Sequence, residues 1–164
     1  MAKEKKDKTP KVEKAEKEAA GEEDSATSYE ARCKNINEVS QPLASKKLTK
    51  KVLKTVKKAA KAKHVKRGVK EVVKGLRKGS KGVVILAGDI SPIDVITHVP
   101  ILCEEANVPY IYVPSKEDLG TAGATKRPTS CIMICGTKGA DYSDAYDEVM
   151  GEVKELNEKL ITLQ

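Results

Sequence analysis

The chain has 164 residues, which is enough for one domain of ordinary size built around a single hydrophobic core. It carries 31 Lys and Arg against 24 Asp and Glu, for a formal net charge of +7, and it contains no Trp or Phe. It has no apolar run of about 18 residues, and its Lys- and Glu-rich N-terminus lacks the features of signal and transit peptides. We therefore expect a soluble protein that is made inside the cell and has no membrane partner.

The positive charge is concentrated in one segment. Residues 46–81 carry 16 basic side chains and one acidic side chain, Glu71, whereas residues 1–45 carry 9 and 10 and residues 82–164 carry 6 and 13. This density of cations favours a polyphosphate partner such as RNA, because binding releases condensed counterions. A solvated lysine-rich face remains the alternative. A membrane surface fits less well, since the apolar faces are narrow and lack Trp and Phe.

The first elements follow from composition and spacing. Residues 1–40 have few large apolar side chains and predict a disordered charged tail, so the single domain is expected to be 41–164. Ser45 suits the N-cap of a helix. The apolar face of this helix is formed by Leu48, Val52, Val56, Ala59 and Ala60.

A second helix is predicted to open at Arg67-Gly68 and to end at Gly79. Its apolar residues at helical spacing are Val69, Val72, Val73 and Leu76. Residues 82–88, GVVILAG, form a short apolar run that is typical of a strand buried on both faces.

The second half continues this alternation. Ser91-Pro92 predicts the cap and first residue of a helix running to Ala106, and Pro100 is expected to kink or divide it. The later elements are a strand at 110–113, a helix at 116–119, a Gly-rich loop, a strand at 129–135 and a helix at 142–160. The pattern predicts an α/β fold, a three-layer α/β/α sandwich around a small mixed sheet of four or five strands.

Motifs of catalysis are missing from the sequence. The segment Gly79–Gly82 lacks the spacing of a phosphate-binding loop, and Gly120–Gly123 lacks the three-glycine dinucleotide pattern and precedes a strand. Asp89 follows the first long strand without a nucleophile or second carboxylate placed to work with it. We expect no enzymatic activity and no cofactor.

The residues that most often bind metals are not grouped as ligands. His64 and His98 have no Cys or Asp at ligand spacing. The four cysteines lie far apart or on apolar runs, which indicates reduced core thiols. These cysteines are Cys33, Cys103, Cys131 and Cys135. We expect no metal site.

Three blocks of sequence carry a family resemblance: RGVKEVVKGLRKG, then GVVILAGDISPIDVITHVPILCEEANVPYIYVPSKEDLG, then TAGATKRPT. From about Gln41 to Thr129 the chain resembles the kink-turn-binding ribosomal protein family. Such proteins bind a sharply bent RNA with tandem sheared G·A pairs. The resemblance implies an α/β/α fold and an RNA site made by the second helix, the loop after the first long strand and the late Gly-Ala loop.

The resemblance also implies site residues. The family has Gly-Asn-Glu at the start of helix two, and the matching positions are Gly68, Lys70 and Glu71. Glu71 would accept hydrogen bonds from a base edge, and an ion pair with Lys74 or Arg67 is the alternative. Lys70 departs from the family pattern, because an ammonium only donates hydrogen bonds whereas an amide also accepts them. This exchange favours binding strength over sequence discrimination.

The remaining positions are carried over from the same segments. Asp89 is expected either at the RNA site or as a helix N-cap. The segment from Leu119 to Ala122 is expected to pack beneath an extruded nucleotide, with basic residues after it along the RNA backbone. The full set of expected RNA-binding residues is Lys66, Arg67, Gly68, Lys70, Glu71, Lys74, Arg77, Lys78, Asp89, Leu119, Gly120, Thr121, Ala122, Lys126 and Arg127.

Within the family, the resemblance is greatest to a subunit of eukaryotic box H/ACA ribonucleoprotein particles. It implies four partners: a box H/ACA guide RNA, nucleolar protein ten, a pseudouridine synthase of the dyskerin type and the glycine-arginine-rich subunit. The implied role is in guide-RNA-directed pseudouridylation, pre-rRNA processing and telomerase RNA stability, in the nucleolus. Two alternatives stay open: a ribosomal or C/D-type kink-turn-binding protein, and a protein-interaction scaffold. The acidic 82–164 segment is a candidate surface for docking another protein.

Overall fold

The computed structural model describes residues 29–136 and 142–162. The chain divides into two compact units, Met1–Lys34 and Asn35–Gln164. In the first unit, residues 29–33 are helical. Residues 1–28, most of the predicted tail, lie outside the described residues.

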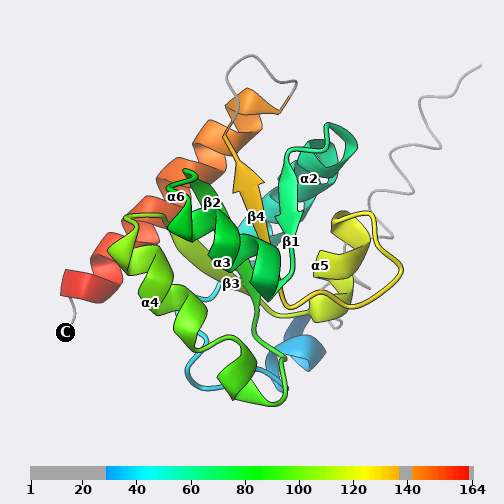
Figure 1. The fold of residues 1–164 in the computed structure, drawn as a ribbon. Coiled ribbons are helices and arrows are strands. Elements are labelled where there is room, and N and C mark those ends of the chain that lie inside the picture. The colour runs from blue at the N-terminus through cyan, green and yellow to red at the C-terminus, as the bar shows by residue number, and fades with distance from the viewer. Residues whose placement is uncertain (1–28, 137–141, 163–164) are drawn as a thin grey trace, which may run out of the picture. The chain divides into compact units, whose positions relative to one another are not determined.

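The second unit alternates helices and strands along the chain (Figure 1). The elements are α2 (Lys46–Lys61), β1 (Val65–Arg67), α3 (Val69–Arg77), β2 (Gly82–Ala87), the 3₁₀ helix η1 (Ile93–Val95), α4 (His98–Glu105), β3 (Tyr110–Val113), α5 (Lys116–Ala122), β4 (Cys131–Cys135) and α6 (Ser143–Thr162). The four strands form one mixed sheet in the order β1-β4-β2-β3. Strands β2 and β3 are parallel, and β4 is antiparallel to β1 and β2. The predicted sandwich around a small mixed sheet is confirmed.

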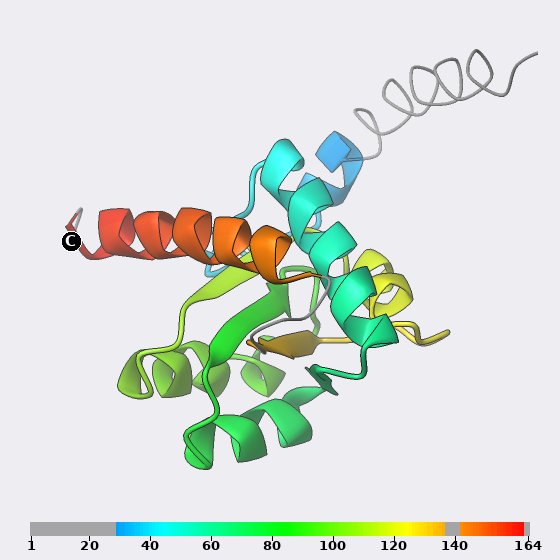
Figure 2. The same cartoon turned by 90° about the horizontal axis from the view of Figure 1, so that it is seen from above.

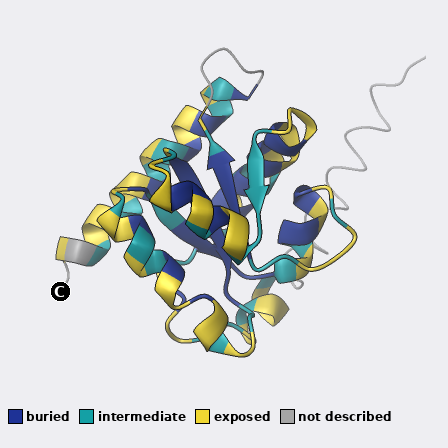
Figure 3. Cartoon of the chain, in the orientation of Figure 1, coloured by how far each residue is buried: buried dark blue, intermediate teal, exposed yellow. Residues whose placement is uncertain are grey.

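The two faces of the sheet bury alternate residues of each strand, as a period of two requires. Val83 and Ile85 pack with α2, α5 and α6, whereas Val84 and Leu86 pack with α3 and α4. Figure 2 separates these layers. Figure 3 shows the sheet buried and the outer sides of the helices exposed. The two lysine-rich helices, α2 and α3, therefore lie on opposite faces of the sheet and do not form one surface.

Helix α2 begins and packs as predicted. The Ser45 hydroxyl accepts a hydrogen bond from the Leu48 amide, and the predicted apolar face is buried. The Lys51 ammonium contacts two carboxylates of α6, 2.5 Å from Glu148 and 2.7 Å from Glu152. These hydrogen bonds raise the pKa of Lys51 to about 12. Part of the acidic charge of the C-terminal helix is therefore balanced inside the domain.

The folded unit begins before residue 41, where the sequence suggested the tail would end. The Asn37 amide donates to the Gly88 carbonyl at 3.0 Å, and the Asn37 side chain donates to the Ile90 carbonyl at 2.8 Å. Ser40 is buried. The boundary at 41 is corrected to about Asn35. Composition missed this segment because polar hydrogen bonds to the loop after β2 hold it, in addition to apolar burial.

Two other local features differ from the sequence prediction. Strand β1 was not predicted, since Arg67 was expected to open a helix, and it forms through pairing with β4, with Val65 opposite Ile134. Pro92 precedes the 3₁₀ helix η1 instead of opening a long α-helix, and the next helix starts at His98. Pro100 is therefore in the first turn of α4, where the missing N–H costs no helical hydrogen bond and no kink results.

Buried thiols are chemically protected. Cys103 and Cys131 are buried, and burial raises the pKa of both to about 12. Cys33 and Cys135 are half-buried, and all four cysteines are free. Because the thiolate is the reactive form, Cys103 and Cys131 are poor nucleophiles at neutral pH.

Of the helices in the described ranges, none has both the length and the apolar character needed to cross a membrane.

Gly151 supplies a test of helix propensity that is independent of function. It is exposed within α6, and a Cβ added there would meet no atom within 4 Å. Replacing Gly151 with Ala is expected to raise the free energy of unfolding by about 0.5–1 kcal/mol, since Ala orders the helix at a smaller entropic cost. Urea denaturation of the two proteins measures this difference. A lower stability for the variant would contradict the assignment of this position to an open helix face.

Candidate nucleic-acid interface

The segments named by the sequence converge at one end of the sheet. Strands β1, β2 and β3 end there and β4 begins, with Arg67 opposite Ile132 and Ala87 opposite Val113. The Gly68 amide donates to the Cys131 carbonyl at 2.8 Å. The start of α3, the loop after β2, and the loop between α5 and β4 are therefore neighbours in space, although they are distant in the sequence (Figure 1).

The start of α3 is open toward solvent. Gly68 is the N-cap of this helix, with φ +79° and ψ 159°, and the N-cap residue makes no side-chain hydrogen bond. A Cβ at Gly68 would meet no atom within 4 Å. This backbone conformation is essentially restricted to glycine, so the conformation, and not crowding, requires glycine here. The first turn adds the positive end of a helix dipole to the site.

Glu71 stabilises this helix start. Its carboxylate accepts a hydrogen bond from the Arg67 amide at 3.0 Å. Within the described part of the chain it forms neither of the ion pairs weighed from sequence, with Lys74 or with the Arg67 guanidinium. Glu71 is exposed, so its second oxygen remains available to a donor outside the chain.

The outer surface of α3 is cationic. Lys70, Lys74, Arg77 and Lys78 are exposed, and together with Val69, Val73 and His98 they line a shallow hollow of about 450 Å³. In the described ranges none of these four cations has an acidic partner. Unpaired cations on one helix face can neutralise successive phosphates, and their positions on α3 agree with the predicted helical face.

Lys66 and Arg67 extend from opposite faces of β1. The Lys66 ammonium donates to the Ser80 hydroxyl at 2.6 Å, and its side chain lies against Gly75 of α3. The side chain of Arg67 is half-buried, and its Nε is buried without a partner among the described residues. Lys66 is thus held by the fold, while Arg67 lies beside the start of α3.

Asp89 links the loop after β2 to α5. Its carboxylate accepts a hydrogen bond from the Lys116 amide at 2.9 Å, and the Lys116 ammonium donates to the Asp89 carbonyl at 3.3 Å. Asp89 was expected either at the RNA site or as a helix cap. Its hydrogen bond to the first turn of α5 matches the capping role.

The predicted Gly-Ala loop is partly helical. Helix α5 extends to Ala122, so Gly120 and Thr121 are in a helix, and Leu119 is fully buried in the core. The helix was predicted to end at Leu119 and to be followed by a Gly-rich loop, and it continues to Ala122 because the N-cap bond from Ser115 and the packing of Leu119 support a longer helix. A Cβ at Gly120 would overlap the Arg127 carbonyl, so the following loop crosses directly over α5.

That loop is held in a compact shape by a residue that the sequence did not reveal. The Thr125 hydroxyl lies 3.0 Å from the carbonyls of both Gly120 and Arg127. Lys126 and Arg127 are consequently presented at the surface. A single threonine between Ala124 and Lys126 has no pattern by which its role could have been found.

The predicted residues therefore fall into three groups. Those at the open end of the sheet are Arg67, Gly68, Lys70, Glu71, Asp89, Thr121, Lys126 and Arg127. Lys74, Arg77 and Lys78 continue along α3 away from that end. Lys66, Leu119, Gly120 and Ala122 are engaged in packing or internal bonds. A small α/β/α domain with an open, cationic helix start beside a basic loop has the features of a protein that binds folded RNA.

Comparison with known proteins agrees with this class. Residues 50–142 match the model of the Ribosomal protein L7Ae/L30e/S12e/Gadd45 family, and the chain belongs to this family. Over 132 residues it is 54% identical to an H/ACA ribonucleoprotein complex subunit 2-like protein of Arabidopsis thaliana, covering 75% of this chain and 85% of that protein. Over 146 residues it is 50% identical to the subunit 2-like protein of Xenopus laevis, covering 89% and 96%.

A solved structure shows the same fold. The Giardia lamblia 15.5kD RNA binding protein superposes with a TM-score of 0.69 at 32% sequence identity. The match covers 74% of this chain and 99% of that chain. The fold predicted from the resemblance is thus found in an RNA-binding relative.

Proposed function

We propose that this chain is an RNA-binding core subunit of the box H/ACA ribonucleoprotein. The relatives named as H/ACA subunit 2 cover most of the chain at about half identity, which supports this role over a ribosomal or C/D-type one. The observation that carries the RNA-binding part is the open, cationic start of α3 at Gly68, next to the loop that presents Lys126 and Arg127.

Some of the proposed contacts position the RNA backbone, and others recognise a base. Lys70 and Lys74 bind phosphates, since both are exposed and unpaired in the described residues. Gly68 lets the RNA approach the backbone without a side chain between them. The free oxygen of Glu71 accepts from a base edge, with guanine the obvious donor, while its other oxygen holds the Arg67 amide.

The proposed biological role is the one that an RNA-binding subunit has in a box H/ACA particle. The subunit holds the guide RNA for pseudouridylation and pre-rRNA processing, and the chemistry belongs to a pseudouridine synthase of the dyskerin type. Nucleolar protein ten and the glycine-arginine-rich subunit are the other proposed protein partners, with telomerase RNA as a further RNA partner. The proposed location is the nucleolus.

Lys70 leads to a prediction about specificity. Because an ammonium does not accept hydrogen bonds, the isolated protein should distinguish a kink-turn from a scrambled stem only weakly. Competition binding at about 150 mM salt measures this preference, and the Lys70→Asn variant should show a larger one. A preference of about a thousandfold by the unaltered chain would overturn the low-specificity proposal.

Salt dependence separates this function from a protein-interaction scaffold. A site that neutralises phosphates loses affinity steeply between about 50 and 200 mM salt. A scaffold that meets the RNA only incidentally would give a flat curve. No affinity for structured RNA even in dilute buffer would end the proposal.

A further inference from the structure

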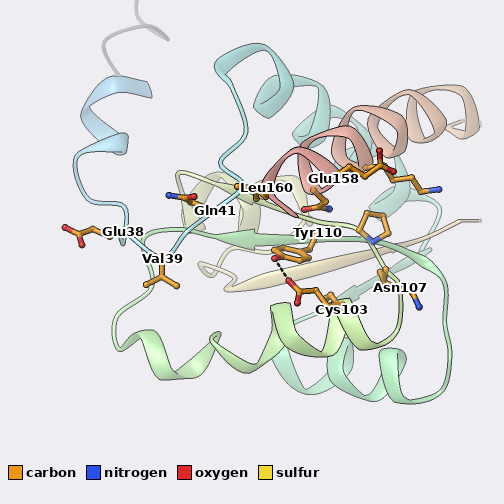
Figure 4. A pocket seen from close by; sticks show the side chains of 13 residues that line it. Glu38, Val39, Gln41, Cys103, Asn107, Tyr110, Glu158 and Leu160 are labelled. Atoms are coloured by element: carbon orange, nitrogen blue, oxygen red, sulfur yellow. Dashed lines mark hydrogen bonds between the residues drawn. The ribbon is translucent and has the colours of Figure 1, made fainter. Parts of the chain in front are cut away.

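Two exposed apolar side chains, Val39 and Ile101, line a common hollow. In the described ranges, the large apolar residues that are exposed are Val39 (66%), Val95 (42%) and Ile101 (59%). Val39 and Ile101 line one hollow of about 230 Å³ beside Tyr110. Val39 and Tyr110 also line a second hollow of about 590 Å³, shown in Figure 4 between α4 and α6. We call the two hollows together the β3 groove. Exposed apolar surface of this kind marks interaction sites in soluble proteins.

The groove contains an uncovered piece of sheet edge. Strand β3 is the outer strand, and residues 42–44 cover part of it: the Tyr112 amide donates to the Pro42 carbonyl at 2.9 Å. The Pro109 carbonyl instead accepts from Val84 of β2. Since successive residues of a strand bond in opposite directions, the amide and carbonyl of Tyr110 face outward like those of Tyr112. Within the described part of the chain they have no backbone partner.

The charge around the groove is opposite to that of α3. Residues 82–115 contain no Lys or Arg. The larger hollow is lined by Glu38, Glu104 and Glu158 against a single cation, Lys154. Glu104 also accepts from the Tyr110 hydroxyl at 2.9 Å (Figure 4). This rim repels a phosphate backbone and complements a partner that carries Lys or Arg next to apolar residues.

We propose that the β3 groove binds an extended segment of a neighbouring protein subunit. The segment adds to the sheet as a strand at Tyr110, because an unpaired edge supplies both a donor and an acceptor. One apolar side chain of the segment lies between Val39 and Ile101, and its basic residues lie beside Glu38 and Glu104. The inference rests on the proposed function, which makes the occupant another protein of the particle. Strands β1 and β3 are opposite edges of the sheet, so RNA and protein can bind together.

The test uses the full chain and three variants, Val39→Asp, Ile101→Asp and the matched control Val95→Asp, whose parent residue is exposed but lines neither hollow. The probes are the three purified protein partners proposed above, and a kink-turn RNA in parallel. We expect Val39→Asp and Ile101→Asp to weaken binding of one protein partner by about tenfold or more, with Val95→Asp near the parent. RNA affinity should change by less than about twofold for Val39→Asp and Ile101→Asp, which lie outside the loop after β2 that contains Val95.

A second measurement addresses the strand addition itself. Hydrogen exchange of the Tyr110 amide in the unaltered chain should slow by about tenfold or more when the partner is bound, because the amide then donates to a strand. Unchanged exchange in the complex, failure of all three proteins to bind, or loss of RNA affinity in place of protein affinity would each refute the groove proposal. So would a dimer that Ile101→Asp disperses, which would make a second copy the occupant. If the parent fails to bind RNA while Ile101→Asp still loses the protein partner, the RNA role fails and the groove stands.

Discussion

A chain in which Lys70, Lys74 and Arg77 are all replaced by glutamine is expected to bind kink-turn RNA about a hundredfold more weakly than the parent. These three cations are exposed along α3 and have no acidic partner in the described residues. Each lost phosphate contact also leaves counterions on the RNA, so the negative slope of log affinity against log salt should become shallower by about 3. Fluorescence anisotropy with labelled RNA across a salt series measures both quantities.

The matched control removes the same charge from the other lysine-rich helix. Lys54, Lys57 and Lys58 are exposed on α2, which packs on the opposite face of the sheet. Replacing all three by glutamine is expected to weaken RNA binding by less than about threefold. If the two triple variants lose affinity equally, net charge alone governs binding and the surface of α3 is not the site.

Replacing Gly68 with Ala is expected to lower both stability and RNA affinity. At φ +79° and ψ 159° an L-residue is strained, so the free energy of unfolding should fall by about 2 kcal/mol. The added methyl group meets no atom of the protein within 4 Å, and under the proposed function it would project toward the bound RNA. We expect RNA affinity to fall by about tenfold. This affinity is measured at temperatures where the variant is folded, so that unfolding does not cause the loss. Urea denaturation and RNA titration measure the two effects.

Gly79 offers a control with a similar backbone. It has φ +73° and no neighbour within 4 Å of a Cβ, and it follows the other end of α3. Gly79→Ala should lose about 1 kcal/mol of stability and keep its RNA affinity. A Gly68→Ala chain that loses stability but binds RNA as well as the parent would show that Gly68 serves only the fold.

The parts of the fold that were predicted have local signals. Helix α2 has a cap and a full apolar face, and strand β2 is an uninterrupted apolar run, so neither depends on a distant partner to be recognised. Strand β1 has no such signal, since it is three residues long and basic in two of them. It exists because β4, far along the chain, pairs with it. Pairing between distant segments is not encoded in a local pattern.

The candidate site divides in the same way. The apolar face of α3 was predicted from helical spacing, which leaves Lys70, Lys74, Arg77 and Lys78 on the other face, and the structure has these four residues exposed. The inward position of Lys66 could not be predicted, because it depends on Gly75 and Ser80 lying beside β1. The end of α5 was predicted too early, at Leu119, because Gly120 suggested a loop, whereas Gly120 permits the close crossing of Arg127 over the helix.

The sequence by itself determined where the cations are, which residues are apolar, and which glycine opens a helix inside the basic segment. Composition and spacing suffice for this, because charge and periodicity are properties of consecutive residues. Only the tertiary structure decided that α2 and α3 lie on opposite faces of the sheet. It also decided that Gly68 lies near the loop after α5, and that the edge of β3 at Tyr110 stays uncovered. The physical reason is strand order, which is set by the joint packing of all the helices on both faces and not by any one segment.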